Sequence, residues 1–225
     1  MSDHFEAYRS LRDRVVALVD GLDHAALGAR VPATPEWSVH ELLAHLVGVT
    51  SDVVAGRLEG VATDPWTAVQ VDVRRTATVA GLLAEWEQNL APLEELVVAL
   101  PPEITGQLVL DAASHEHDLR HALAAPGACD STAVDVAFWW MCEVATADRP
   151  GGLRLETERG AQAFGRGAPE ARVRAPRFEL LRAITGRRSF AQIAALDWDP
   201  APRAELLVVS PPFSARDDDL VEVAS

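Results

Sequence analysis

The chain has 225 residues, which is enough for one large domain or two small ones. It carries 34 acidic and 20 basic residues, for a formal net charge of −14, and this balance argues against binding to nucleic acid or to an anionic membrane surface. Nearly half of the residues (48%) are hydrophobic, so the chain can bury a core. We find no apolar stretch of membrane-spanning length, no secretory signal pattern and only two cysteines, and therefore expect a cytoplasmic protein.

The first half of the chain is predicted to be helical, because apolar residues recur there every three or four positions. The expected helices cover residues 5–22, 38–53, 82–100 and 104–123. Ser38 and Glu41 form a capping box that begins the second helix, and Pro92 is expected to kink or break the third. Residues 32–35 and 56–65, which contain prolines and glycines, are expected to be loops. Four amphipathic helices are typical of a four-helix bundle.

The pattern changes after residue 127. One more helix is predicted over residues 132–147, followed by alternating segments around residues 153–157 and 173–175 that are typical of strands. Two short helices follow, the second opened by the capping box of Ser189 and Gln192, then a strand at residues 206–209 and a frayed end over the last dozen residues. We therefore predict a mainly α protein with a helical domain over residues 1–127 and a smaller α+β domain over residues 128–225.

The segment LVLDAASHEHDLRHAL, residues 108–123, contains the densest group of candidate metal-binding side chains in the sequence. On a helical wheel, Asp111, His115 and Asp118 lie in the apolar stripe that is expected to form the core, together with Ile104, Leu108, Leu119 and Ala122. Glu116 and Arg120 face away from it. Burial of a carboxylate and an imidazole is unfavourable unless they pair with each other or bind an ion. Asp111 and His115 are one helical turn apart and can reach the same point, as two ligands of one metal ion do.

A third ligand has to come from another helix. The helix over residues 38–53 offers His40 and His45, neither of them central on its apolar face, and His45 is the better candidate because core residues flank it. A hydrogen-bonded Asp–His pair without metal, with Asp118 satisfied by an arginine, is the alternative. His117 and His121 are not expected to be ligands.

Two motifs now point to a family. WSVHELLAHL (residues 37–46) and DAASHEHDLRHAL (residues 111–123) resemble the mycothiol-dependent maleylpyruvate isomerase family, within the actinobacterial members of the DinB-like metalloproteins. FELLRAITGRRS (residues 178–189) is similar to a stretch in the smaller domain of many members. The resemblance implies a DinB-like bundle with His45, Asp111 and His115 as metal ligands. The family's His-x-x-Asp pattern is matched by His115 and Asp118, and Asp118 would orient His115 or an arginine. Asp111 departs from the family, because the isomerases typically carry glutamate at that position.

The resemblance also implies an activity. Three protein ligands leave an open position on a divalent metal, for which zinc is the first choice and nickel or iron are possible. Mycothiol would bind there as a thiolate and attack a small electrophile, in a reaction of the S-transferase or isomerase type. Arg182 or Arg187 would hold a carboxylate of the substrate. A metal-dependent hydrolase, a non-catalytic metal- or ligand-binding protein and a metal-free scaffold are the alternatives, and we expect a monomer or a homodimer.

Overall fold

The structure is a computed structural model that describes residues 3–209 and 212–222. The chain is mainly helical, with a small sheet in its C-terminal part. Its internal contacts divide it into two compact units, with the division between Gly127 and Ala128. Each unit is described separately below. None of the described helices is both long enough and apolar enough to span a lipid bilayer.

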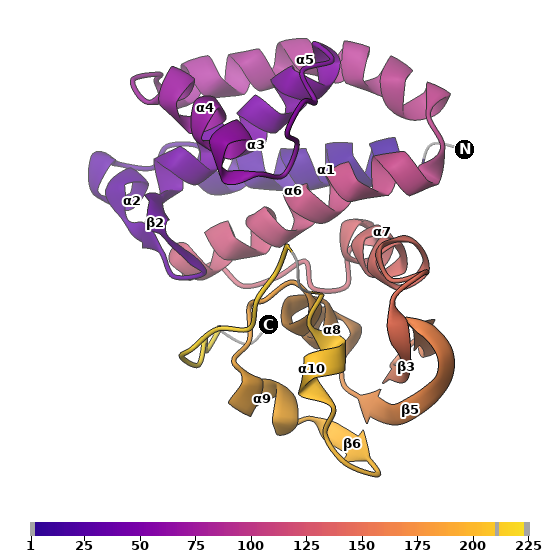
Figure 1. Ribbon diagram of the computed structural model, residues 1–225. Coiled ribbons are helices and arrows are strands. Elements are labelled where there is room, and N and C mark those ends of the chain that lie inside the picture. Colours follow the sequence, from indigo (N-terminus) through magenta and orange to yellow (C-terminus); the bar gives the residue numbers. More distant parts are fainter. Residues whose placement is uncertain (1–2, 210–211, 223–225) are drawn as a thin grey trace. The chain divides into compact units, whose positions relative to one another are not determined.

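The first unit is helical (Figure 1). Its elements are α1 (Asp3–Val19), α2 (His24–Gly28), β1 (Arg30–Val31), β2 (Thr34–Ser38), α3 (Val39–Val54), α4 (Asp64–Arg74), α5 (Val79–Ala99) and α6 (Pro102–Ala122). Helices α1 and α3 each pack against both α5 and α6, and α4 packs against α3. The core between the long helices is apolar and includes Leu11, Val15, Leu42, Leu46, Trp86, Leu93 and Leu119.

The start of α3 confirms the predicted capping box. The Ser38 side chain accepts a hydrogen bond from the backbone N–H of Glu41 at 3.2 Å, and the Glu41 carboxylate accepts one from the backbone N–H of Ser38 at 2.8 Å. These bonds satisfy two of the backbone donors that the first turn of a helix leaves unpaired. They fix where α3 begins, and therefore the face on which His45 lies.

Helix α5 continues through Pro92, so the expected break does not occur. Pro92 is exposed, and water can satisfy the carbonyl group that loses its N–H partner on that side of the helix. The loop predictions on either side of α3 are confirmed only in part, for the turn at residues 32–33 and for residues 56–63. Residues 30–38 contain the antiparallel pair β1–β2, and α4 begins at Asp64, directly before Pro65. Proline is tolerated in the first turn of a helix, so Pro65 marks a helix start here.

The second unit combines short helices with a four-stranded sheet. Its elements are α7 (Thr132–Trp140), a π-helical turn η1 (Met141–Ala145), β3 (Pro150–Thr157), β4 (Gly160–Phe164), β5 (Arg166–Arg174), α8 (Arg177–Ile184), α9 (Phe190–Ala194), β6 (Asp197–Asp199) and α10 (Ala204–Leu207). The strand order is β4-β3-β5-β6, with β3 and β5 parallel and the other neighbours antiparallel. Leu153, Leu155 and Val173 are buried, as their alternation predicts.

Two predictions for the end of the chain were wrong. Residues 204–207 form the helix α10 where we expected a strand, because a short apolar run does not by itself distinguish the two. The last dozen residues were expected to fray, yet Leu220 is buried and Glu222 forms ion pairs with two buried arginines. Residues 223–225 lie outside the described part.

Candidate metal centre

Three side chains from α3 and α6 meet in the first unit: His45, Asp111 and His115. Each offers one ligand atom, and these atoms lie within 4.8 Å of one another. Oδ1 of Asp111 lies 3.6 Å from Nε2 of His45 and 3.7 Å from Nε2 of His115. An ion bonded at about 2.0–2.2 Å to each atom fits between ligands at such separations.

The two histidines are buried and the aspartate is not. His45 is 3% exposed and His115 8% exposed, whereas the Asp111 side chain keeps 33% of its surface accessible. Solvent therefore reaches the cluster at Asp111, whereas the two imidazoles are enclosed. A site that takes up a metal ion and a further ligand needs access of this kind.

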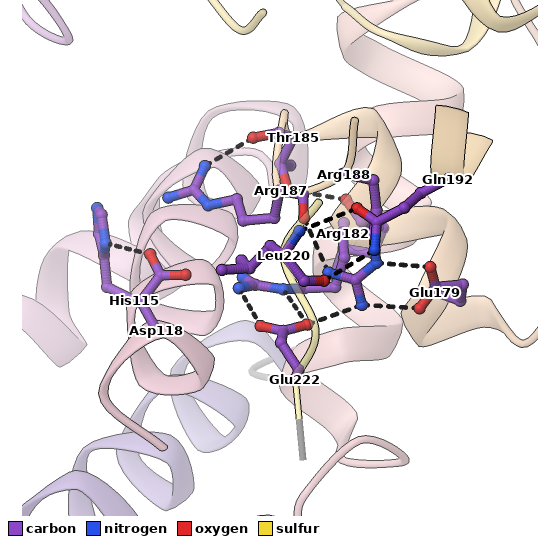
Figure 2. Close-up of polar contacts among 11 residues, drawn as sticks. His115, Asp118, Glu179, Arg182, Thr185, Arg187, Arg188, Gln192, Leu220 and Glu222 are labelled. Atoms are coloured by element: carbon purple, nitrogen blue, oxygen red, sulfur yellow. Dashed lines mark hydrogen bonds and ion pairs between the residues drawn. The ribbon is translucent and has the colours of Figure 1, made fainter. Parts of the chain in front are cut away.

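His115 is oriented by the next turn of its own helix. Its Nδ1 lies 3.1 Å from Oδ2 of Asp118, which is completely buried, and Figure 2 shows the two side chains facing each other. A carboxylate accepts hydrogen bonds, so Nδ1 carries the proton and Nε2 keeps its lone pair on the Asp111 side. Burial lowers the pKa of the His115 imidazole, although Asp118 and Asp111 act in the opposite direction. A neutral imidazole is the form that binds metals.

His45 provides the test of whether this set of residues fits a metal. Its Nδ1 lies 2.8 Å from Oε1 of Gln70 on α4. Its Nε2 is buried and has no hydrogen-bond partner among the residues that the structure describes. A buried polar atom without a partner is unfavourable, and a cation between His45 and Asp111 would remove that cost. The donor set of two imidazoles and one carboxylate suits zinc and similar divalent ions.

Trp37 borders the same cluster. Its ring lies 4.9 Å from the His45 ring and 5.9 Å from the His115 ring, measured between centroids. It belongs to β2, which the sequence did not reveal, so Trp37 was not among the predicted site residues. Its position in the WSVHELLAHL motif was the available signal. Gln70 was missed for a stronger reason, because α4 itself was not predicted.

The helical wheel was wrong about one buried charge. Glu116 was expected to face away from the core, yet it is completely buried, with ion pairs to Arg14 at 2.6 Å and to Arg120 at 2.9 Å. Helix α6 packs against both α1 and α3, so more than one of its faces is enclosed. Ile104, predicted to be core, is exposed at the start of the same helix. His117 is buried too, and the described part of the chain does not place it in the three-residue cluster.

Comparison with known protein families shows to which family the chain belongs. The family described as the mycothiol maleylpyruvate isomerase N-terminal domain matches residues 8–124, more than half of the chain. The chain belongs to this family. The matched range contains the whole cluster of His45, Asp111 and His115.

Two solved structures are similar to this family member over both units. They are crystal structures of the mycothiol-dependent maleylpyruvate isomerase and of a histidine-to-alanine mutant of it, with TM-scores of 0.58 and 0.59. Each is 14% identical to the chain, and each match covers 88% of this chain and 94% of the other. At this level of identity the likeness concerns the fold alone. No curated protein matches the chain.

The second unit of this family member contains the arginines predicted to bind substrate. Arg182 is almost completely buried, and its guanidinium forms two hydrogen bonds with the Glu222 carboxylate, at 2.5 Å and 3.2 Å (Figure 2). Arg188 contacts the same carboxylate at 2.8 Å and also binds Glu179. Arg187 donates a hydrogen bond to the backbone carbonyl of Thr185 at 2.7 Å.

Arg182 therefore already binds a carboxylate of its own chain. Burial raises the pKa of Glu222, but the attraction of Arg182 and Arg188 and their hydrogen bonds outweigh it, so that the pKa lies below the usual glutamate value. A substrate carboxylate at Arg182 would have to compete with Glu222. The substrate-binding roles of Arg182 and Arg187 remain predictions.

Proposed function

We propose that the chain binds a divalent metal ion through Nε2 of His45, the carboxylate of Asp111 and Nε2 of His115, and that it acts with mycothiol on a small electrophile. The observation that carries this proposal is the convergence of two buried imidazole nitrogens on one carboxylate oxygen, with His45 Nε2 lacking any hydrogen-bond partner among the described residues. Membership of the mycothiol maleylpyruvate isomerase family supports the choice of thiol. Zinc is the ion that the donor set favours.

Each residue has a definite part in this proposal. The three ligands fill three positions and leave at least one for a further ligand. When bound, the ion favours the deprotonated, nucleophilic form of a thiol that coordinates it. Asp118 holds the His115 ring so that Nε2 faces the site, and the Trp37 ring lies beside the two imidazoles.

The scaffold belongs to the same proposal. We take α1, α3, α5 and α6 as a four-helix bundle of the DinB-like type, with ligands on the facing helices α3 and α6. Bundles commonly build metal sites from side chains on facing helices. Asp111 is one bond shorter than the glutamate expected from the family resemblance, so its carboxylate reaches less far from the α6 backbone.

The experiment is a thiol-dependent turnover assay. Metal-loaded protein is incubated with mycothiol and either a maleylpyruvate-like compound or a chloro-aromatic electrophile, and the loss of thiol and of electrophile is followed. We expect turnover that needs both metal and thiol and that is abolished in His115→Ala but retained in His24→Ala, a change at an exposed histidine of α2. Metal binding without turnover across a broad panel of electrophiles would indicate a binding protein, and turnover without thiol would indicate a hydrolase. Either result contradicts the proposal.

A further inference from the structure

A line of polar side chains leads from the surface of the first unit to His45. Nε of Arg57 donates a hydrogen bond to Oδ1 of Asp52 at 2.8 Å, and Nη2 of Arg57 forms an ion pair with the same oxygen at 2.7 Å. The side-chain amide of Gln70 donates from Nε2 to Oδ2 of Asp52 at 2.9 Å. Oε1 of Gln70 lies 2.8 Å from Nδ1 of His45. These four residues come from α3, from the segment after it and from α4.

The chemistry of these groups fixes the direction of every bond. A carboxylate accepts hydrogen bonds, so Asp52 is the acceptor and Arg57 and Gln70 are the donors. The Gln70 amide must therefore turn its NH2 toward Asp52 and its oxygen toward His45. An amide oxygen is also only an acceptor, so the proton of the hydrogen bond belongs to Nδ1 of His45. Nε2 is then the unprotonated nitrogen, and it is the atom nearest Asp111.

We infer that Gln70 and Asp52 are positioning residues that hold His45 in its Nδ1–H tautomer and thereby keep the lone pair of Nε2 in the metal site. The inference rests on the proposed function only for its effect on metal affinity; the tautomer follows from the hydrogen bonds alone. Partners of this kind act through the ligand, fixing the ring and raising its basicity.

Burial makes the arrangement effective. Gln70 is 1% exposed, His45 3% and Asp52 8%, so water does not compete for these hydrogen bonds. The helices also approach closely at this point. A Cβ atom added at Gly48, three residues after His45, would lie 2.5 Å from Cβ of Gln70. Only glycine lets α4 come near enough for Gln70 to reach the imidazole.

The direct test is the tautomer of His45 in metal-free protein. Two-bond ¹H–¹⁵N correlation spectra of histidine-labelled protein distinguish the two neutral tautomers, and His45→Asn assigns the signal. We expect His45 in the Nδ1–H form in the wild type and a mixture, or the Nε2–H form, in Gln70→Leu. An Nε2–H tautomer in the wild type would overturn the inference even if no variant folds.

Metal affinity is the second measurement. Competition with a chromophoric zinc chelator should show affinity about 10–100-fold weaker in Gln70→Leu, and also weaker in Asp52→Asn, whose amide no longer dictates the direction of the Gln70 bond. Gln88→Leu is the matched control, because Gln88 is exposed on α5. Unchanged zinc affinity and an unchanged tautomer in Gln70→Leu would overturn the inference. If His45 has the expected tautomer but the protein binds no zinc, the roles of Gln70 and Asp52 in fixing the tautomer are confirmed. The proposed function is then contradicted instead.

Discussion

The indole ring of Trp37 lies 4.9 Å from the imidazole of His45, with 36° between the ring planes. Trp37 belongs to β2 and His45 to α3, so the strand that precedes α3 places an aromatic ring beside a ligand of the candidate metal centre. Any change at the ligand is therefore close to one particular fluorophore among the six tryptophans of the chain.

Cobalt or nickel should quench the fluorescence of Trp37. These ions quench at short range, and the indole is in contact with the His45 ring that would bind them. Titration of metal-free protein with Co²⁺ should show saturable quenching in the wild type and in Trp198→Phe, a change in the second unit. Trp37→Phe should lose most of the quenching, and equal quenching in all three proteins would contradict this placement.

The three proposed ligands should differ from nearby histidines in their effect on metal content. His45→Ala, His115→Ala and Asp111→Asn should each weaken zinc binding by more than the roughly 10–100-fold expected for loss of a supporting partner such as Asp118. Asp111→Glu keeps a carboxylate with a longer reach, and we expect it to retain metal. Isothermal titration with zinc gives these affinities.

The matched control for the ligand series is His24→Ala, which removes an exposed imidazole from the same unit. It should bind zinc like the wild type. If it loses as much affinity as His115→Ala, the metal is bound nonspecifically and the ligand assignment is wrong.

Gly48→Ala should disturb the site although residue 48 is not a ligand. The new methyl group would collide with Cβ of Gln70, and a Cβ cannot move without its backbone. We expect α4 to shift, the Gln70–His45 hydrogen bond to break, and the free energy of unfolding to fall by about 1–3 kcal/mol. Urea unfolding and zinc affinity measure the two effects. Gly28→Ala, at a position with no neighbouring atom within 4 Å, should change neither appreciably.

Glu222 should make the stability of the second unit depend on pH. Its pKa is lowered in the folded protein despite burial, because Arg182 and Arg188 stabilise the charged form. The stabilisation is present above the ordinary glutamate value of 4.5 and is lost as the pH falls through the lower pKa of the folded state.

At neutral pH, Glu222→Gln should therefore be less stable than the wild type by about 3–5 kcal/mol, since it leaves two arginines buried without their shared carboxylate. The difference should shrink steadily once the pH is below 4.5. Denaturant unfolding across this range measures it, with the exposed Glu95→Gln as the control. A difference that does not change with pH would mean that the charge of Glu222 contributes nothing.

The sequence predicted what depends on local signals. The capping box of Ser38 and Glu41 marked the start of α3, and the spacing of Asp111 and His115 placed both on one side of α6. What it could not reveal depends on contacts between distant segments. Gln70 reaches His45 only because Gly48 lets α4 pack closely on α3. Glu116 is buried because Arg14, about a hundred residues earlier, neutralises it across the α1–α6 contact.

The prediction for Arg182 shows a related limit. An arginine in an amphipathic helix is normally solvated, and no local pattern indicates that Glu222, 40 residues later, returns to bind it. Pairing of this kind is a property of the folded chain, because the carboxylate and the guanidinium share one buried site only after the last segment has packed.

One measurement tests the central claim most directly: X-ray data collected at the zinc absorption edge from crystals of the zinc-loaded protein. The account predicts a single strong anomalous peak per chain, at bonding distance from Nε2 of His45, a carboxylate oxygen of Asp111 and Nε2 of His115. A crystal without anomalous signal at this cluster, or with zinc bound only at other residues, would contradict it.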